Sequence, residues 1–325
     1  MCSSDLGEGI TPKFVGDRAL VERAVITLAG TRGLLLVGEP GTAKSMLSEL
    51  LAAAVCGTSA LTVQGTAGTT EDQIRYGWNY ALLLSGGPRR EALVPSPVLT
   101  AMERGAIARI EEITRCLPEV QDAMVSVLSE RRLMVPELGE AGVVHARPGF
   151  SVIATANLRD RGVSELSAAL KRRFNFETVP PIATFSDEVA LVQRQVAATV
   201  APAGVTSTAD QRVVEALVTA FRDLRGGRTA EGWPVERPGA VLSTAEAVGV
   251  ASSLALETAF FPERDELALV PGYLLGVVLK DDPKDRGRLL AYWDGAVRRR
   301  ADPATAHPNA DLWRKLVDLR RVLEE

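Results

Sequence analysis

The chain has 325 residues, of which 46% are hydrophobic and 24% are charged, and its formal net charge is -4. This ordinary globular composition favours two soluble domains, and the acidic balance argues against a dedicated nucleic-acid surface. No apolar run is long enough to cross a bilayer, and residues 1–9 lack the basic and apolar segments of a secretory signal, so we expect a cytoplasmic protein. Three cysteines without a metal-ligand spacing and two histidines far apart in sequence argue against a zinc site.

The first two thirds of the chain alternate strand-like apolar runs with amphipathic helical stretches. In chain order, we expect helices at 21–29 and 45–55, and strands at 33–37, 61–64, 106–110, 150–155 and 175–178. This alternation predicts an α/β domain with a doubly wound parallel sheet.

A second, helical domain is expected after Pro180 and Pro181, where the strand signals stop. Helical patterns follow at 186–200, 209–224, 243–261 and 311–323. A proline restricts the residue before it and cannot continue a strand ladder, so the proline pair marks the boundary. We therefore predict a doubly wound core over residues 1–181 and a helical domain over residues 182–325. The basic cluster near its end is expected on a solvated helix face and comprises Arg298, Arg299 and Arg300.

The strand at 33–37 runs directly into a glycine-containing loop that opens the next helix. The loop consists of Gly38, Glu39, Pro40, Gly41, Thr42, Ala43, Lys44 and Ser45, and Met46 follows it. In this context a Walker A motif wraps phosphates with backbone N–H groups, and the helix N-terminus adds its positive end. Lys44 would then reach the outer phosphates of ATP, and the Ser45 hydroxyl would bind Mg²⁺. The pattern asks for glycine at Ala43, where alanine tolerates a helical entry but not a strongly left-handed one, so a simple glycine-containing turn stays an alternative.

The strand at 106–110 ends in two carboxylates, Glu111 and Glu112. The carboxyl edge of a doubly wound sheet is where such folds bind ligands. Glu111 can hold the Mg²⁺ shell, and Glu112 can polarise the water that attacks the γ-phosphate. Taken alone, two adjacent glutamates are also a commonplace surface pair.

The acidic pair stands in a longer pattern made of residues 109–115, 117–123 and 128–131. In order and spacing, this pattern resembles the Walker B region of MoxR-type AAA+ ATPases. The resemblance begins near Val15 and Gly16, runs through Asn157 to Phe174, and weakens in the last third of the chain. It implies an AAA+ P-loop core followed by a C-terminal helical lid, with Val15 and Gly16 among the residues that bind the nucleotide.

The chain departs from the family pattern at two positions. Family strands usually end in Asp-Glu, whereas Glu111 stands at the place of the aspartate. One methylene longer, it should still serve the metal through water, and slow hydrolysis stays open. Ala245 stands where family members often carry the sensor 2 arginine, a role that Arg237 could take. The loop with Ala43, in contrast, resembles the variant loop of one MoxR branch.

The resemblance assigns further roles near the end of the first domain. Asn157 corresponds to sensor 1, whose amide would orient the attacking water; without the motif order, a turn asparagine would be the preferred interpretation. Arg173 corresponds to the arginine finger that reaches the ATP of a neighbouring subunit, with Arg172 as second candidate and a surface Lys-Arg-Arg cluster as alternative. Residues 132–148 would form a hairpin insertion, and residues 62–78 a glycine-rich loop near the ring surface.

The function that the resemblance implies is a ring-forming, hexameric ATPase that uses ATP and Mg²⁺ to remodel or activate a partner protein. In this family the partner often has a von Willebrand factor A domain, and hydrolysis would occur at subunit interfaces. Ala43, Glu111 and the missing sensor 2 arginine leave open a nucleotide-gated scaffold that hardly turns over. A DNA-associated AAA+ motor is a third interpretation, against which the acidic balance speaks. A small-molecule kinase is least supported, because no acceptor site is recognisable.

Overall fold

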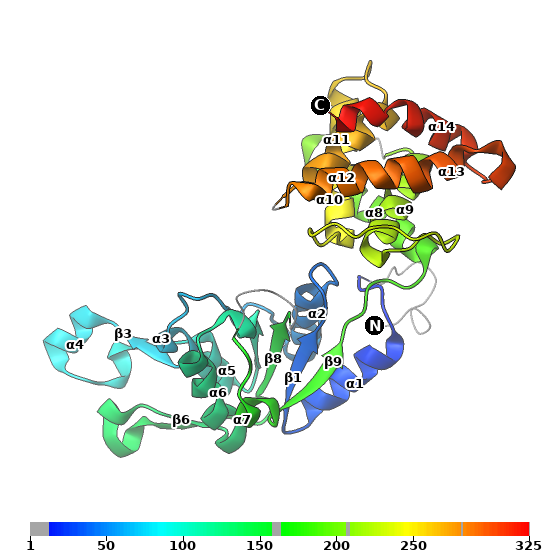
Figure 1. The fold of residues 1–325 in the computed structure, drawn as a ribbon. Coiled ribbons are helices and arrows are strands. Elements are labelled where there is room, and N and C mark those ends of the chain that lie inside the picture. Colours follow the sequence, from blue (N-terminus) through cyan, green and yellow to red (C-terminus); the bar gives the residue numbers. More distant parts are fainter. Residues whose placement is uncertain (1–12, 158–163, 206–208, 281, 325) are drawn as a thin grey trace, which may run out of the picture. The chain divides into compact units, whose positions relative to one another are not determined.

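The computed structural model of the chain describes residues 13–157, 164–205, 209–280 and 282–324 (Figure 1). The segment 1–9, considered above for a secretory signal, lies outside these residues. Contacts between residues divide the chain into two units, of which the first ends at Pro180 and the second begins at Pro181, with Pro40–Thr42 grouped in the second.

The first unit is built on a parallel sheet, and the predicted α/β class is confirmed. Within the described residues the sheet has five strands in the order β2-β5-β8-β1-β9. The strands are β1 (Gly33–Val37), β2 (Thr62–Gln64), β5 (Ile107–Glu111), β8 (Ser151–Ala156) and β9 (Phe174–Thr178). All their pairings are parallel, so the carboxyl ends of the strands lie at one edge.

Helices cover both faces of this sheet. The helices of the first unit are α1 (Arg18–Ala29), α2 (Lys44–Cys56), α3 (Glu71–Ile74), α4 (Tyr80–Gly86), α5 (Pro97–Arg104), α6 (Pro118–Glu130) and α7 (Ala168–Lys171), of which α4 lies away from the sheet (Figure 1). Leu34 and Leu36 of β1 point to one face, where they pack with α1 and α2. Leu35 and Val37 point to the other face and pack with α5 and α6. This alternation follows from the two-residue period of a strand, and burial on both faces explains why β1 is apolar throughout.

Two small antiparallel hairpins extend from the first unit, on the side of the sheet away from α1 (Figure 1). One pairs β3 (Tyr76–Trp78) with β4 (Leu93–Pro95), and the other pairs β6 (Arg132–Met134) with β7 (Val143–His145). The Tyr76 hydroxyl joins them by donating to Glu137 Oε2 at 2.9 Å. The expected hairpin over residues 132–148 is therefore confirmed, whereas residues 62–78 contain β2, α3 and β3 rather than a glycine-rich loop.

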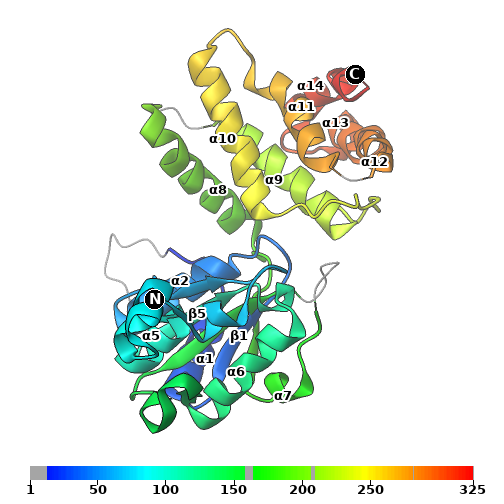
Figure 2. The same ribbon diagram turned by 90° about the vertical axis from the view of Figure 1, so that its left-hand side faces the viewer.

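The second unit is helical. Its helices are α8 (Phe185–Val200), α9 (Gln211–Gly226), α10 (Thr244–Phe260), α11 (Glu266–Val278), α12 (Lys284–Tyr292), α13 (Arg298–Ala301) and α14 (Ala310–Asp318). Figure 2 shows α8, α9 and α10 running alongside one another, and their buried faces belong to one hydrophobic cluster. Sequence periodicity identified α8, α9, α10 and α14 but not α11, whose interior contains Pro271. None of the helices that the structure describes has the length and apolar character that crossing a bilayer requires.

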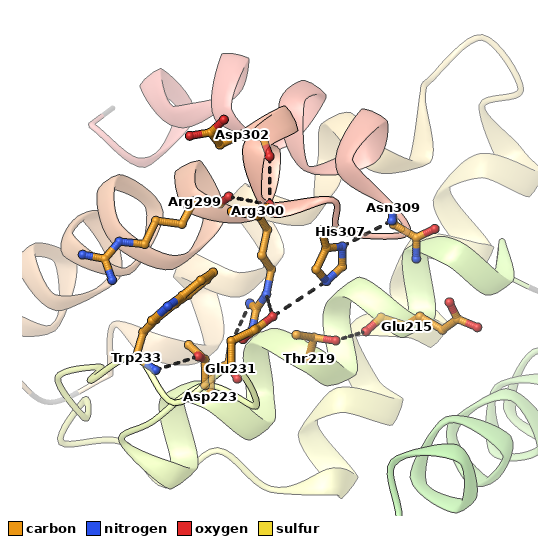
Figure 3. Close-up of polar contacts among 12 residues, drawn as sticks. Glu215, Thr219, Asp223, Glu231, Trp233, Arg299, Arg300, Asp302, His307 and Asn309 are labelled. Carbon is orange, nitrogen blue, oxygen red and sulfur yellow. Dashed lines mark hydrogen bonds and ion pairs between the residues drawn. The ribbon is translucent and has the colours of Figure 1, made fainter.

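A buried charge centre lies inside the second unit (Figure 3). Arg300 is fully buried, and its guanidinium donates to Asp223 Oδ2 at 2.6 Å and to Glu231 at 2.7 and 2.8 Å. Tyr292 also donates its hydroxyl to Asp223 Oδ2 at 2.9 Å. The prediction that the basic cluster is a solvated helix face is therefore wrong for Arg300, because α13 turns this side chain inward while Arg299 stays exposed.

Candidate functional site

The loop after β1 turns through two left-handed residues before α2 begins. Gly41 has φ 74°, and Ala43 has φ 63° and ψ 26°. The expectation that alanine would not take a left-handed conformation here is wrong: the Ala43 carbonyl accepts the first helical bond of α2, from the Leu47 N–H at 2.9 Å, which holds the residue in place. The N-terminal N–H groups of α2 then form a positive helix end, with no acidic residue in its first turn.

The Lys44 side chain folds back over this loop. Its Nζ donates to the Gly38 carbonyl at 2.9 Å and to the Glu39 carbonyl at 2.7 Å. These contacts hold the ammonium above the loop, where an anion bound by the helix N-terminus would meet it. Ser45, the next residue, is exposed, and Met46 is half-buried.

The sheet order brings the predicted site residues to neighbouring strand ends. β8 lies between β1 and β5, with Val37 opposite Ala156 and Ile110 opposite Ala154. The loop 38–46, the acidic pair and Asn157 therefore lie at the ends of three adjacent strands on the same carboxyl edge, where ligands bind in sheets of this kind. Asn157 itself is 8% exposed.

Glu111 is buried and held by hydrogen bonds on both carboxylate oxygens. Oε1 accepts from Ser48 Oγ at 2.5 Å and from Arg109 Nη2 at 2.8 Å, and Oε2 accepts from Thr155 Oγ1 at 2.7 Å. Burial works to raise the pKa of Glu111, but hydrogen bonds from Ser48, Ser45 and Thr155 and the charge of Arg109 outweigh it and lower the pKa. The carboxylate is therefore ionised at neutral pH.

This arrangement fits Mg²⁺. The Ser45 hydroxyl helps to lower the pKa of Glu111, so the two proposed ligands lie close together at the start of α2. Both offer only oxygen, the donor that Mg²⁺ prefers. The described residues include no group of three or more His, Cys, Asp or Glu side chains that could hold a metal ion. In nucleotide sites, Mg²⁺ usually binds with one or two carboxylates, water and the phosphates.

Glu112 has a strained backbone and an accessible side chain. Its φ is 51° and its ψ is 49°, values that are unfavourable for a residue with a Cβ. The Glu112 N–H donates to Thr155 Oγ1 at 2.9 Å, and its carboxylate pairs with Arg115. With a side chain 43% exposed, Glu112 is more accessible to an attacking water than Glu111, whose side chain is 6% exposed.

Several residues of this edge escaped the sequence prediction. Gly65, after β2, donates its N–H to the Glu111 carbonyl at 2.7 Å, and a Cβ there would lie 2.4 Å from the Glu112 carbonyl oxygen. Only glycine permits so close an approach. For Arg109 the sequence offered a clue, because a charged residue inside an otherwise apolar, buried strand predicts a hydrogen-bonded or ionic partner. For Ser48 and Thr155 the sequence offered no clue, because a hydroxyl is common at such positions.

The remaining predicted residues lie on other parts of the chain. Val15 and Gly16 precede α1, beside Phe14, which packs on the cluster of α1, β1 and α2. Arg173 donates from Nη1 to the Ala169 carbonyl at 2.6 Å and also bonds to Ser129 of α6, within its own chain. Arg172 is exposed.

In the second unit, Ala245 is exposed in the first turn of α10. Arg237 donates to the Gly226 carbonyl at 2.6 Å, so its guanidinium is bound within the unit.

Comparison with known proteins assigns both units. Residues 33–174 match the AAA domain of the dynein-related subfamily, and residues 186–324 match the YehL-like AAA+ ATPase C-terminal domain. The chain is 50% identical to YehL of Escherichia coli strain K12, described as uncharacterized, over 295 residues that cover 90% of this chain and 81% of YehL. This chain belongs to the YehL-like AAA+ ATPases. The MoxR-type AAA+ family expected from the sequence is confirmed.

More distant similarities agree with this assignment. The YehL-like protein is 32% identical to YojN of Bacillus subtilis strain 168 over 176 residues, which cover 51% of this chain and 53% of YojN. The crystal structure of NtrX from Brucella abortus in complex with ATP aligns with 97% of this chain and 69% of the NtrX chain, with a TM-score of 0.53 and 15% identity. At that identity, the alignment shows a shared fold.

Proposed function

We propose that this YehL-like protein binds ATP with Mg²⁺ at the loop 38–46 and hydrolyses it. The observation that carries the proposal is the convergence of Lys44, the ionised Glu111 and the accessible Glu112 on one carboxyl edge of the sheet, at the ends of β1 and β5 on either side of β8. NtrX, with which the chain shares its fold, has been crystallised with ATP, and this supports the choice of nucleotide.

Each residue has a defined part in this reaction. On binding ATP, the ammonium of Lys44 leaves its hydrogen bonds to the Gly38 and Glu39 carbonyls and binds the β- and γ-phosphates instead. N–H groups of the loop bind the phosphate oxygens. Ser45 and Glu111 would hold Mg²⁺, which would supply positive charge to neutralise the phosphates and orient the terminal group. Glu112 orients the attacking water as its general base, and the amide of Asn157 fixes that water from the neighbouring strand.

The proposal extends to an assembly. Arg173, with Arg172 as the alternative, would act on the ATP of a neighbouring subunit in a homo-oligomeric, hexameric ring, and would leave its bonds to Ala169 and Ser129 to do so. Movement between subunits would then remodel a protein client, with von Willebrand factor A domain proteins as first candidates. Family membership supports an assembly of this general kind.

Steady-state ATP hydrolysis over a series of protein concentrations tests the proposal. Lys44→Ala is expected to lose ATP binding, because the loop loses its charge. Glu112→Gln should bind ATP but turn over at least about 100-fold more slowly, as expected for loss of a general base. Specific activity that rises with concentration supports sites shared between subunits. A wild type that binds ATP without hydrolysing it would instead establish the nucleotide-gated scaffold.

A further inference from the structure

Arg109 is a charged residue in the middle of a strand that is buried at every position. Its side chain is 9% exposed. The guanidinium donates from Nε to Ser48 Oγ at 3.0 Å and from Nη2 to Glu111 Oε1 at 2.8 Å. Its further acceptors, at 3.0 to 3.2 Å, are the Ser59 carbonyl, Thr62 Oγ1 and the Ser45 carbonyl.

These contacts satisfy a charge that would otherwise be costly. A buried guanidinium without partners would lose its hydration with nothing in exchange, which is strongly unfavourable for a single ion. Here its planar, rigid fork reaches α2, the segment before β2, and the carboxylate two residues further along its own strand. The phosphate-loop helix and the acidic strand end are thus tied to a single side chain.

The same contacts determine which oxygen of Glu111 is available. A carboxylate oxygen accepts about two hydrogen bonds. Oε1 receives Ser48 and Arg109 and is filled, whereas Oε2 receives Thr155. Oε2, with one of these bonds, therefore keeps an acceptor position, which the Mg²⁺ shell or the nearby Ser45 hydroxyl can take. Because Arg109 also bonds to the Ser45 carbonyl, the two proposed metal ligands are oriented by one residue.

We propose that Arg109 is a positioning residue that acts through Glu111 and sets the Mg²⁺ dependence of nucleotide binding. The inference rests on the proposed ATP site and goes beyond it. Glutamate has one more rotatable bond than aspartate, so a free Glu111 would spread over more rotamers and present either oxygen. Arg109 and Ser48 remove this freedom. A strand of this kind can thereby use glutamate in place of aspartate without losing a defined ligand position.

The competing explanation is that Arg109 only joins α2 to β2 through Ser45, Ser59 and Thr62. A joint of that kind would support the phosphate loop whether or not Mg²⁺ is present. The two explanations differ in one measurable quantity, the ratio between the ATP dissociation constants without and with Mg²⁺. A positioning role changes this ratio, and a purely structural role changes both constants alike.

The experiment measures ATP binding to the full chain by calorimetry, once in EDTA and once with saturating Mg²⁺. Arg109→Met keeps the length and removes the charge, and the ratio is expected to fall by about 10- to 100-fold, the usual effect of losing a residue that orients a metal ligand. Arg109→Lys should give an intermediate ratio, since one ammonium cannot replace the fork. In a Glu111→Gln background, Arg109→Met should change the ratio no further.

The inference is overturned by a folded Arg109→Met protein with an unchanged ratio, or with both constants weakened equally. It is also overturned if Arg109→Met lowers the ratio as much in the Glu111→Gln background. Should Arg109→Met fail to fold, as judged by near-UV circular dichroism, Ser48→Ala removes one bond from Glu111 Oε1 and one from Arg109, and an unchanged ratio there is equally decisive. A wild type that binds no ATP would overturn the proposed function as well, whereas binding lost only in Lys44→Ala leaves that function standing.

Discussion

At the scale of single residues, Ala43 holds a conformation that is costly for an amino acid with a Cβ. In the left-handed region, Cβ crowds the carbonyl oxygen that follows, at a cost of about 1–2 kcal/mol. The phosphate loop and the start of α2 maintain this state at φ 63°. The loop therefore stores strain next to the lysine that is proposed to bind phosphate.

Replacing Ala43 by glycine should release that strain. Ala43→Gly is expected to raise the free energy of unfolding of the first unit by about 0.5–1 kcal/mol, less than the full strain because glycine adds entropy to the unfolded chain. Urea-induced unfolding measures this change. Gly57→Ala is the matched control: Gly57 ends the same helix at φ 77° with open space around its Cβ position, and the substitution should destabilise. Two substitutions that destabilise alike would contradict the strain at Ala43.

At the scale of elements, the end of β2 approaches the acidic strand so closely that a side chain does not fit between them. Gly65 bonds to the Glu111 carbonyl, and its Cα faces the Glu112 carbonyl. Strand β2 therefore supports the strained backbone from which the Glu112 side chain projects. This makes the edge strand part of the site although it supplies no predicted ligand.

Gly65→Ala should displace the strand end that carries Glu112. Because displacements of about 1 Å can cost about 100-fold in rate, we expect the ATPase rate to fall by roughly 10- to 100-fold while ATP binding persists. Gly77→Ala in β3 is the control, since a Cβ at Gly77 meets nothing within 4 Å. Equal rates for the two variants would show that the approach of β2 does not matter for turnover.

In the second unit, the charge centre of Figure 3 joins three helices and a loop. Arg300 of α13 pairs with Asp223 of α9 and with Glu231, and Tyr292 of α12 completes the group. Burial acts to raise the pKa of Glu231, but hydrogen bonds from Arg300 and Thr229 outweigh it and lower this pKa to about 2. Burial raises the pKa of Asp223 despite its contact with Arg300.

Removing the cation should be far more damaging than removing an exposed neighbour. Arg300→Met leaves Asp223 buried without its cation, and breaking a buried pair in this way costs about 3–5 kcal/mol. Arg299→Met, on the same helix but exposed, should cost about 1 kcal/mol or less, chiefly through its contact with Trp233 at 5.4 Å. Denaturation of the second unit measures both. Similar losses in the two variants would show that the buried centre adds no stability.

At the scale of the whole molecule, the proposed arginine finger is tested by mixing subunits. Arg173→Ala should abolish hydrolysis and spare ATP binding, because the guanidinium acts on a neighbour's transition state. Mixed with Lys44→Ala, it should regain part of the activity, since some interfaces then combine an intact loop with an intact arginine. Arg172→Ala in the same mixture distinguishes the two candidates. If no mixture recovers activity, the sites are not shared between subunits.

The α/β order, the loop between β1 and α2, and the helical character of the last third could all be predicted from the sequence. These features depend on interactions over a few residues. The apolar run 33–37 has to be buried, and a glycine-containing loop with Lys44 has to open a helix. Helices α11 to α13 were not predicted from the sequence. Pro271 lies inside α11 and breaks its helical sequence pattern, and a π-helical turn at Trp293–Val297 separates α12 from α13.

Which charged side chains are buried, and which partners they bind, depends on the tertiary structure. Arg109 bonds to Ser48, which is 61 positions away in the sequence, and Arg300 bonds to Asp223, which is 77 positions away. Periodicity placed Arg300 on a solvated face and left Arg109 without a role, because burial of a guanidinium is favourable only when distant acceptors are assembled around it. The orientation of the Glu111 carboxylate, and with it the proposed Mg²⁺ site, is likewise set by contacts between strands and helices that are far apart in the chain.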